Sequence, residues 1–277
     1  MIFAWLARVA PVALRAGGLL TFEPFLGDRA VSMQIKAGIL VVFTLVLAPV
    51  VPLRAAPADA VGWVEMVISE TMVGVLLALS LQVVFEALQL AGQISGIQLG
   101  LSLATLFDPL SEANSGALSV FFNVLTLLLY LQFNVHHWVL RVLARSFDYL
   151  PVGTMVASQL LTREVVRAMG EVFVLGVQIA APVVLLTLLI DLVIAFLSKA
   201  SPQLPALFLG IPVKSLTGYA LLIGMVNLWP EILERRFAWS IGTAVRHVAG
   251  SAAKGAGADR DHHDGGGQPL AARWLPR

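Results

Sequence analysis

The sequence predicts an all-α, multi-helix protein that associates with a membrane. Of its 277 residues, 58% are hydrophobic and only 13% are charged, whereas about 25% of the residues of a soluble domain are charged. The mean hydropathy is +0.86. Apolar runs of helical length alternate with short polar or proline-containing connections along most of the chain. The shortage of charge decides the class, because a water-exposed surface needs more charged side chains than this.

The composition also excludes several kinds of site. The chain has no cysteine, so disulfides, thiolate metal sites, iron–sulfur clusters and cysteine nucleophiles are excluded. The formal net charge of +1 gives no sign of a nucleic-acid partner. The sequence contains no GxSxG, HExxH or P-loop motif. We therefore predict a protein that is not an enzyme and that holds no cofactor or metal.

The first elements are apolar but short or interrupted. Residues 1–22 form an apolar run in which Arg8 and Arg15, seven residues apart, share one helix face. No basic region precedes this run, so we predict a retained interfacial helix rather than a cleaved signal peptide. A polar connection over 23–36 leads to an apolar run over 37–53, which is short for a bilayer core of about 30 Å.

The stretch Gln82–Pro109 organises the rest of the chain. It follows an apolar run over 63–85, and the two together predict one very long helix or two helices broken near Glu86. A polar stripe has steps of four, three and four residues, which place its members on one helix face. These residues are Gln82, Glu86, Gln89 and Gln93. A small-residue stripe has steps of four and comprises Gly92, Gly96, Gly100 and Ala104.

The two stripes indicate different roles. Glycine in a helix interior costs about 1 kcal/mol relative to alanine, so the small-residue stripe predicts close packing against another helix. The polar stripe has two open interpretations: it lines a hydrated path, or it contacts polar groups of neighbouring helices. Proline disfavours the helical conformation of the residue before it. We therefore expect the helix to end near Asp108-Pro109, with turn-forming residues over 108–116.

The second half of the chain begins with the longest uncharged run, residues 117–138, which ends in His136 and His137. Adjacent histidines on a helix point about 100° apart, and no acidic residue nearby completes a metal set. We interpret them as packing residues at the end of a span. An amphipathic linking helix is expected over 159–170. At the other end, residues 249–277 are rich in Gly, Ala, Asp and His and predict a disordered tail.

Residues 172–197 and 206–229 predict a helical hairpin joined by the loop 198–205. Asp191 and Lys214 lie on its two arms. Because charges at membrane depth are costly and mark function by default, we predict two buried functional charges. Three arrangements are open for them: a mutual pair, contact with another subunit, or a water-lined position. Their unequal distances from the loop favour the last two.

Four segments of the chain carry a family resemblance. They are PFLGDRAVSMQIKAG (Pro24–Gly38), VFEALQLAGQISGIQLGLSLATLFDP (Val84–Pro109), NVHHWVLRVLARSF (Asn134–Phe147) and SPQLPALFLGIPVK (Ser201–Lys214). In this order and spacing they resemble the FliR/SctT family of type III secretion export-gate subunits, in which FliR is the flagellar form and SctT the virulence form. The resemblance covers about residues 5–245, and the His-His-Trp segment is closer to the flagellar branch.

The resemblance implies a fold and a set of partners. Residues 1–170 would fold like FliP, and residues 171–248 like the helical hairpin of FliQ with a helix after it. The chain would join FliP-like and FliQ-like subunits in a hetero-oligomeric export gate, with an FlhB-type subunit around its cytoplasmic mouth. Unfolded flagellar substrates would pass through this gate. Its expected location is the bacterial inner membrane, in contact with lipid, within the flagellar basal body.

The resemblance also implies site residues. The loop after the GLSLAT run would project into the pore as a plug whose bulky apolar side chains seal the closed channel. The matching residues are Leu103, Leu106, Phe107, Asp108 and Pro109. Leucine stands at 103 and 106, where family members often have phenylalanine, so an aliphatic seal is expected. A second loop would lie toward the cytoplasmic mouth and comprises Pro202, Gln203 and Leu204.

Two other functions stay open at this point. A secondary transporter or channel for a small solute would need inverted repeats with broken helices in both halves, and the sequence shows no such symmetry. The equivalent SctT-type subunit of a virulence secretion system would share the fold and differ in the substrates that pass.

Overall fold

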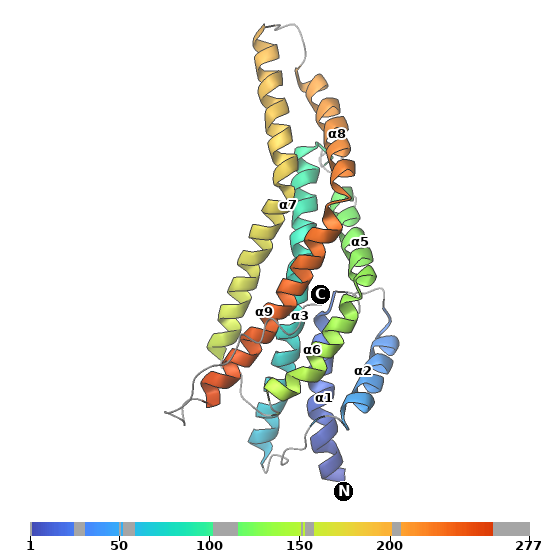
Figure 1. Ribbon diagram of the computed structural model, residues 1–277, viewed down its shortest axis with the longest axis vertical. Coiled ribbons are helices and arrows are strands. Elements are labelled where there is room, and N and C mark those ends of the chain that lie inside the picture. Colours follow the sequence, from blue (N-terminus) through green and yellow to red (C-terminus); the bar gives the residue numbers. More distant parts are fainter. Residues whose placement is uncertain are drawn as a thin grey trace. The chain divides into compact units, whose positions relative to one another are not determined.

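A computed structural model describes residues 2–24, 31–49, 51, 59–101, 116–150, 152, 158–200 and 206–256 of the chain. Within these residues every regular element is an α-helix (Figure 1). The helices are α1 (Ile2–Phe22), α2 (Met33–Leu47), α3 (Ala60–Gln98), α5 (Ala117–Gln132), α6 (Val135–Tyr149), α7 (Ser158–Ala200), α8 (Ala206–Met225) and α9 (Trp229–Ala256). The all-α prediction is confirmed.

Several helices are long enough and apolar enough to cross a bilayer. Among the described residues, α3 and the part Arg163–Ala200 of α7 meet both conditions as single helices. The number of candidate membrane spans among the described residues rises from 2 to 4 if the helix pairs α5–α6 and α8–α9 are each counted as one broken span. Helix α2 is apolar but shorter, as expected for its run. These lengths and compositions support membrane association.

The chain divides into two compact units. Unit 1 comprises residues 1–83, 134–168 and 236–277, and unit 2 comprises residues 84–133 and 169–235. Helices α3, α7 and α9 therefore contribute residues to both units. The family resemblance implies two domains that follow each other along the chain and meet at residue 170. The two compact units are instead each made of separate segments, so the domain boundary at residue 170 stays a prediction.

Unit 1 is built around α1, which packs against α2 and crosses α3 closely. A Cβ atom added to Gly18 of α1 would lie 2.6 Å from the carbonyl oxygen of Thr71, a distance that real Cβ atoms do not adopt. On α3, a Cβ atom added to Gly74 would likewise be too close to the backbone of α1, at 2.9 Å from the nitrogen of Leu19. Glycine on both helices lets the two backbones approach, and this brings the side chains beside the crossing into direct contact.

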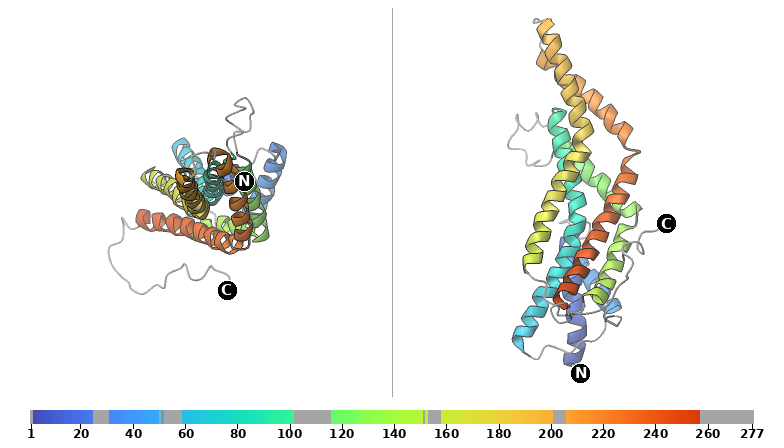
Figure 2. Two further views of the ribbon diagram at one scale, coloured as in Figure 1. Left: turned by 90° about the horizontal axis from the view of Figure 1, so that it is seen from above. Right: turned by 60° about the vertical axis from the view of Figure 1, so that its left-hand side comes forward.

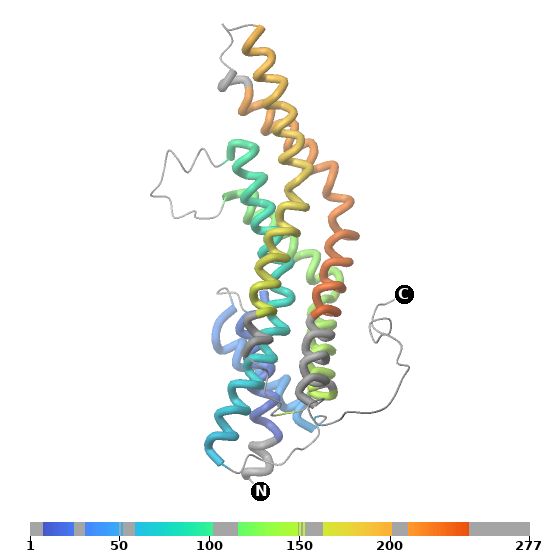
Figure 3. The backbone as a smooth tube through the Cα atoms, turned by 90° about the vertical axis from the view of Figure 1, so that its left-hand side faces the viewer, coloured from blue at the N-terminus to red at the C-terminus, as the bar shows by residue number. Residues whose placement is uncertain are grey.

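Unit 2 contains the second part of α3, helix α5 and the hairpin of α7 and α8. Figure 3 shows α5 (green) beside the end of α3 (teal). Phe85 and Tyr130 pack edge to face between these two helices, with ring centroids 5.8 Å apart. The ring of Phe122 in α5 packs against the ring of Trp229, with ring centroids 4.7 Å apart. Aromatic contacts of this kind add to the stability that the buried area supplies.

The structure revises where some elements begin and end. Helix α3 runs unbroken through Glu86, so the single-helix alternative is correct. The expected span 117–138 is two helices, because Asn134 adopts a left-handed conformation with φ 53°, which asparagine tolerates. The expected linking helix 159–170 is the first part of α7. Helix α9 continues to Ala256, beyond the expected start of the tail.

Candidate functional site

The expected plug and the cytoplasmic-mouth loop lie outside the described residues. This applies to Leu103, Leu106, Phe107, Asp108, Pro109, Pro202, Gln203 and Leu204. The structure does describe the residues on either side of the plug segment, Leu101 and Gly116. Both belong to unit 2. The candidate site is therefore the set of contacts in unit 2 that hold these two ends.

Helix α3 ends earlier than predicted. Its last helical residue is Gln98, and Gly100 follows in the left-handed conformation with φ 76°. The Gly100 N–H donates to the carbonyl of Ile97 at 3.1 Å, and the Leu101 N–H donates to the carbonyl of Gly96 at 2.9 Å. These two bonds form a Schellman cap. Glycine enters this conformation without steric cost, so Gly100 stops the helix before the proline is reached.

One prediction is thereby corrected. The expectation that α3 continues to Asp108-Pro109 is wrong, because the cap closes the helix at Gln98. Gly100 follows the last helical residue, and its role in helix packing stays a prediction.

Leu99 connects the end of α3 to α8. Its side chain is fully buried. The Ser215 hydroxyl of α8 donates a hydrogen bond of 2.9 Å to the Leu99 carbonyl, one of the carbonyls that a helix end leaves without an intrahelical partner. One turn further along α8, a Cβ atom added to Gly218 would lie 3.1 Å from the Cγ atom of Leu99. Helix α8 thus supplies a donor for the backbone and space for the side chain.

The start of α5 packs closely against α3 at Gly92. A Cβ atom added to Gly92 would lie 2.7 Å from the Cα atom of Ser119 and 3.0 Å from the carbonyl oxygen of Leu118. This is a close approach of the kind that the glycine spacing predicts. The same atom added to Gly96 would lie 3.8 Å from the Cβ atom of Leu118, an ordinary contact. Of the two glycines, only Gly92 lies where a larger residue does not fit.

The polar stripe is unevenly exposed in the single chain. Glu86 and Gln93 are exposed, whereas Gln82 and Gln89 are partly buried. This exposure does not distinguish between water in a channel and polar groups of another subunit as the surroundings of the stripe. Both interpretations of the stripe therefore stay predictions.

Asp191 and Lys214 form an ion pair between the two arms of the hairpin. The Lys214 Nζ atom lies 2.5 Å from the Asp191 Oδ1 atom. Helices α7 (gold) and α8 (orange) are the two arms of this hairpin (Figure 2). The mutual pair, which the sequence favoured least, is the arrangement present. The prediction that both are buried is not met within the chain, because 20% of the Lys214 side chain and 49% of the Asp191 side chain are exposed.

A buried polar cluster in unit 1 escaped the sequence analysis. The Arg15 guanidinium lies 2.7 Å from the Glu70 carboxylate and donates to the Ser146 hydroxyl at 2.9 Å and the Leu150 carbonyl at 3.1 Å. Its carbon lies 4.0 Å from the centre of the Phe147 ring. Arg15 and Glu70 are almost fully buried. Desolvation lowers the pKa of Arg15 from its ordinary value, and the charge of Glu70 opposes this shift.

This cluster could have been detected from one signal. Arg15 lies three residues before Gly18, and Glu70 lies four residues before Gly74. Each charge therefore shares a helix face with a glycine. From the sequence, Arg15 was attributed to an interfacial helix face, whereas the glycine crossing of α1 and α3 brings it against Glu70.

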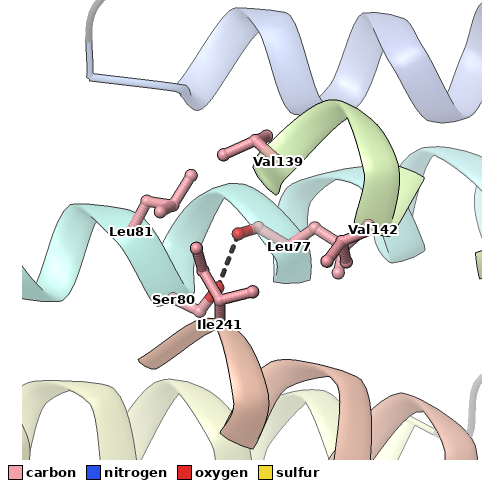
Figure 4. Close-up of a pocket in the computed structure, with 6 residues that line it drawn as sticks. All are labelled: Leu77, Ser80, Leu81, Val139, Val142 and Ile241. Carbon is pink, nitrogen blue, oxygen red and sulfur yellow. Dashed lines mark hydrogen bonds between the residues drawn. The ribbon is translucent and has the colours of Figure 1, made fainter. Parts of the chain in front are cut away.

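One cavity in unit 1 is small, with a volume of about 10 Å³. It is lined mostly by aliphatic side chains (Figure 4), and the Ser80 hydroxyl there donates to the Leu77 carbonyl of its own helix. A space of this size holds about one water. No group of three or more His, Asp or Glu side chains in the described part could hold a metal ion. The rings of His136 and His137 lie 4.2 Å apart.

Comparisons with known proteins place the chain in a family. Residues 6–239 match the family described as bacterial export proteins, family 1. The flagellar biosynthetic protein FliR of Pectobacterium carotovorum subsp. carotovorum is 33% identical over 84% of this chain and 89% of that protein. FliR of Escherichia coli strain K12 is 30% identical over 84% and 90%. FliR of Caulobacter vibrioides is 27% identical over 80% and 91%. The chain therefore belongs to the bacterial export proteins, family 1, as its resemblance to FliR predicts.

Proposed function

We propose that the chain is a non-enzymatic subunit of the flagellar type III protein export gate. The observation that carries this proposal is the family match over residues 6–239, together with relatives that are named flagellar biosynthetic protein FliR. The comparisons give no support to a small-solute transporter or to a virulence-system subunit. The chain supplies shape, helix contacts and a closed state to a channel through which unfolded flagellar substrates pass.

The surface of the hairpin supports a place in a membrane-embedded complex. Helix α7 exposes a row of large apolar side chains in the single chain: Leu185, Leu188, Leu189, Leu192, Val193 and Phe196. Within the part Arg163–Ala200 of α7, only 17% of the apolar stretch that is long enough to cross a bilayer is buried inside the chain. A face of this extent is normally covered by lipid or by other subunits. We propose that FliP-like and FliQ-like subunits cover part of it in the bacterial inner membrane, with an FlhB-type subunit at the cytoplasmic mouth.

The closed state is proposed to depend on the plug segment. Leu103, Leu106 and Phe107 would form an apolar constriction, and such a constriction excludes ions because water leaves it. The contacts of Leu99 with α8 and of Gly92 with α5 support this proposal, because they hold the two ends of the segment within unit 2.

Assembly is tested by purification. The chain is co-expressed with the FliP-, FliQ- and FlhB-type proteins of its own organism, and the mass of the purified complex is measured. We expect a stable complex that contains all four. A stable monomer that binds a small solute and joins none of them would exclude the gate function.

Sealing is tested by substitution. Serine at positions 103, 106 and 107 should raise the ion permeability of cells that contain the assembled complex, because the constriction loses its apolar lining. The control is Leu103→Phe with Leu106→Phe, which keeps the lining apolar and should leave the permeability low. Equal permeability of the serine and phenylalanine variants, at equal amounts of complex, would show that these residues do not form the seal.

A further inference from the structure

One face of α6 exposes basic side chains. His137, Arg141 and Arg145 are all exposed, and steps of four residues place them in a row along one side of the helix. At about 1.5 Å per residue, the row is about 12 Å long. We call these three residues the basic row of α6.

The opposite face of α6 is fixed inside unit 1. Val139, Leu143 and Phe147 of this face are buried. Arg15 of α1 donates a hydrogen bond to the Ser146 hydroxyl, and its guanidinium carbon lies 4.0 Å from the centre of the Phe147 ring. Because these contacts hold the buried face of α6 in the core of unit 1, the basic row faces away from that core.

The exposed surface of the chain changes where α6 begins. Helix α5 exposes a set of large apolar side chains: Val120, Phe121, Val124, Leu128 and Leu131. Only Phe133 and Asn134 separate the end of α5 from the start of α6. Among the side chains of α6 that the structure describes, no large apolar one is exposed. The surface therefore passes from apolar to basic within a few residues.

Such a change is expected where a protein passes from the acyl chains of a bilayer to its headgroups. Basic side chains next to an apolar span are attracted to anionic headgroups. Trp138, which is partly exposed beside the first residue of the basic row, belongs to a residue type that is enriched at the same level of the membrane. The start of α6 combines both features.

The basic row also carries an excess of positive charge. Two arginines stand against one acidic residue of α6, Asp148. Arg141 forms no ion pair with the residues that the structure describes. Arg145 does make a contact within the chain, but a guanidinium has five N–H donors and can serve a second partner.

Other groups of arginines in the chain are balanced by acids. Arg163 and Arg167 of α7 have the same spacing as the two arginines of α6, and Glu164 and Glu171 accompany them. The segment Glu231–Arg236 of α9 contains two glutamates and two arginines. Both groups are formally neutral, so a particular attraction for anions is expected of α6 and not of these.

We propose that the basic row of α6 binds the phosphate groups of anionic phospholipids at the membrane surface. The fork of N–H donors on each arginine matches two phosphate oxygens, and the ring of His137 supplies a further N–H donor. An acidic segment of another protein would satisfy the same charge. Lipid is favoured because the apolar surface of α5 leads directly to the basic row, an arrangement that a protein partner does not require.

This inference goes beyond the proposed export function. It rests on the membrane association of the chain and on the described contacts and exposure of α6, and it does not depend on what passes through the complex.

The first test measures lipid binding by the purified full chain in a neutral detergent. Native mass spectrometry counts the phosphatidylglycerol molecules that stay bound, and phosphatidylcholine with the same acyl chains is the probe without net charge. Each basic side chain near an anionic surface strengthens the attraction by about 5-fold. Arg141→Gln should therefore weaken phosphatidylglycerol binding by about this factor and leave phosphatidylcholine binding unchanged.

Two further variants separate charge at this position from charge in general. Arg163→Gln removes an exposed arginine from another helix of unit 1 and should bind phosphatidylglycerol as the parent does. Arg141→Lys keeps the charge and should retain most of the binding. An equal loss in Arg141→Gln and Arg163→Gln, or an unchanged affinity in Arg141→Gln at parental Tm, would show that the basic row is not the lipid site.

Inorganic phosphate distinguishes a lipid site from a site for the free ion. At the same concentration as the lipid, it should not displace phosphatidylglycerol, because the acyl chains add apolar contacts that the free ion lacks. Displacement by phosphate would mean that the site takes the ion, and the assignment to lipid would be wrong.

Assembly distinguishes lipid from a protein partner. In co-expression with the FliP-, FliQ- and FlhB-type proteins, Arg141→Gln should give the parental yield of complex. If the variant loses the complex while phosphatidylglycerol binding by the chain alone stays parental, the basic row is a protein interface and the inference is overturned. If the parental chain itself joins no complex, the proposed export function fails, and the lipid measurement on the chain alone still decides this inference.

Discussion

Arg15 and Glu70 form an ion pair that is shielded from solvent by their own chain, with 0% and 1% of the two side chains exposed. Ser146, Phe147 and the carbonyl of Leu150 surround the rest of the guanidinium. The pair joins α1 to α3, and its outer partners come from α6 and the residue after it. A single buried group thus fixes three separate parts of unit 1.

Removing the carboxylate should destabilise the protein strongly. Glu70→Gln leaves Arg15 buried without a counter-charge, and breaking a buried pair on one side costs about 3–5 kcal/mol. We expect a marked loss of the protein from the membrane and a lower Tm of the purified complex. The control is Glu231→Gln, which breaks the exposed pair with Arg235 and should change the Tm little. Similar losses in both variants would contradict the role given to burial.

The ion pair of Asp191 and Lys214 should matter more as a pair than as single charges. Lys214→Met leaves Asp191 without its partner on an apolar surface, and an unpaired charge there is costly once lipid or another subunit covers it. The double variant Asp191→Asn with Lys214→Met should therefore assemble better than Lys214→Met alone. The yield of intact complex measures this. An additive loss in the double variant would show that the two residues do not act together.

Gly92 and Gly96 should respond differently to the same substitution. Gly92→Ala brings a Cβ atom within 2.7 Å of the Ser119 Cα atom, so α5 has to shift, at a cost of about 1–3 kcal/mol. Gly96→Ala meets only the Leu118 Cβ atom at 3.8 Å and should be neutral or stabilising. The Tm of the two purified variants is the measurement. Equal effects would mean that α5 does not pack as described.

Gly100 should resist substitution for a reason other than space. Alanine in its left-handed conformation, with φ 76°, costs about 1–2 kcal/mol. We expect Gly100→Ala to lower the Tm and to raise the ion leak, because the direction in which the chain leaves α3 changes. Gly170→Ala, within α7 and with nothing inside 4 Å, is the matched control. If Gly100→Asn, which tolerates this conformation, behaves as badly as alanine, backbone strain is not the cause.

Local features were predicted with different success. The glycine spacing located the close approach at Gly92, because a helix repeats every 3.6 residues and neighbours on one face can be counted. The end of α3 was misplaced, because Gly100 fits a regular glycine stripe and a helix cap equally well. The break at Asn134 was missed. The hydrophobic pattern of residues 117–138 is the same whether or not one residue within it adopts the left-handed conformation.

Composition and order of segments were enough to determine the helical membrane class and the export family, because both depend on local properties of the chain. The tertiary structure decided which groups meet. Arg15 and Glu70 are 55 positions apart, and Ser215 and Leu99 are 116 apart. Such pairs form only where two helices cross, and the crossing depends on how glycines and large side chains of separate helices fit together. No periodicity within one segment contains that information.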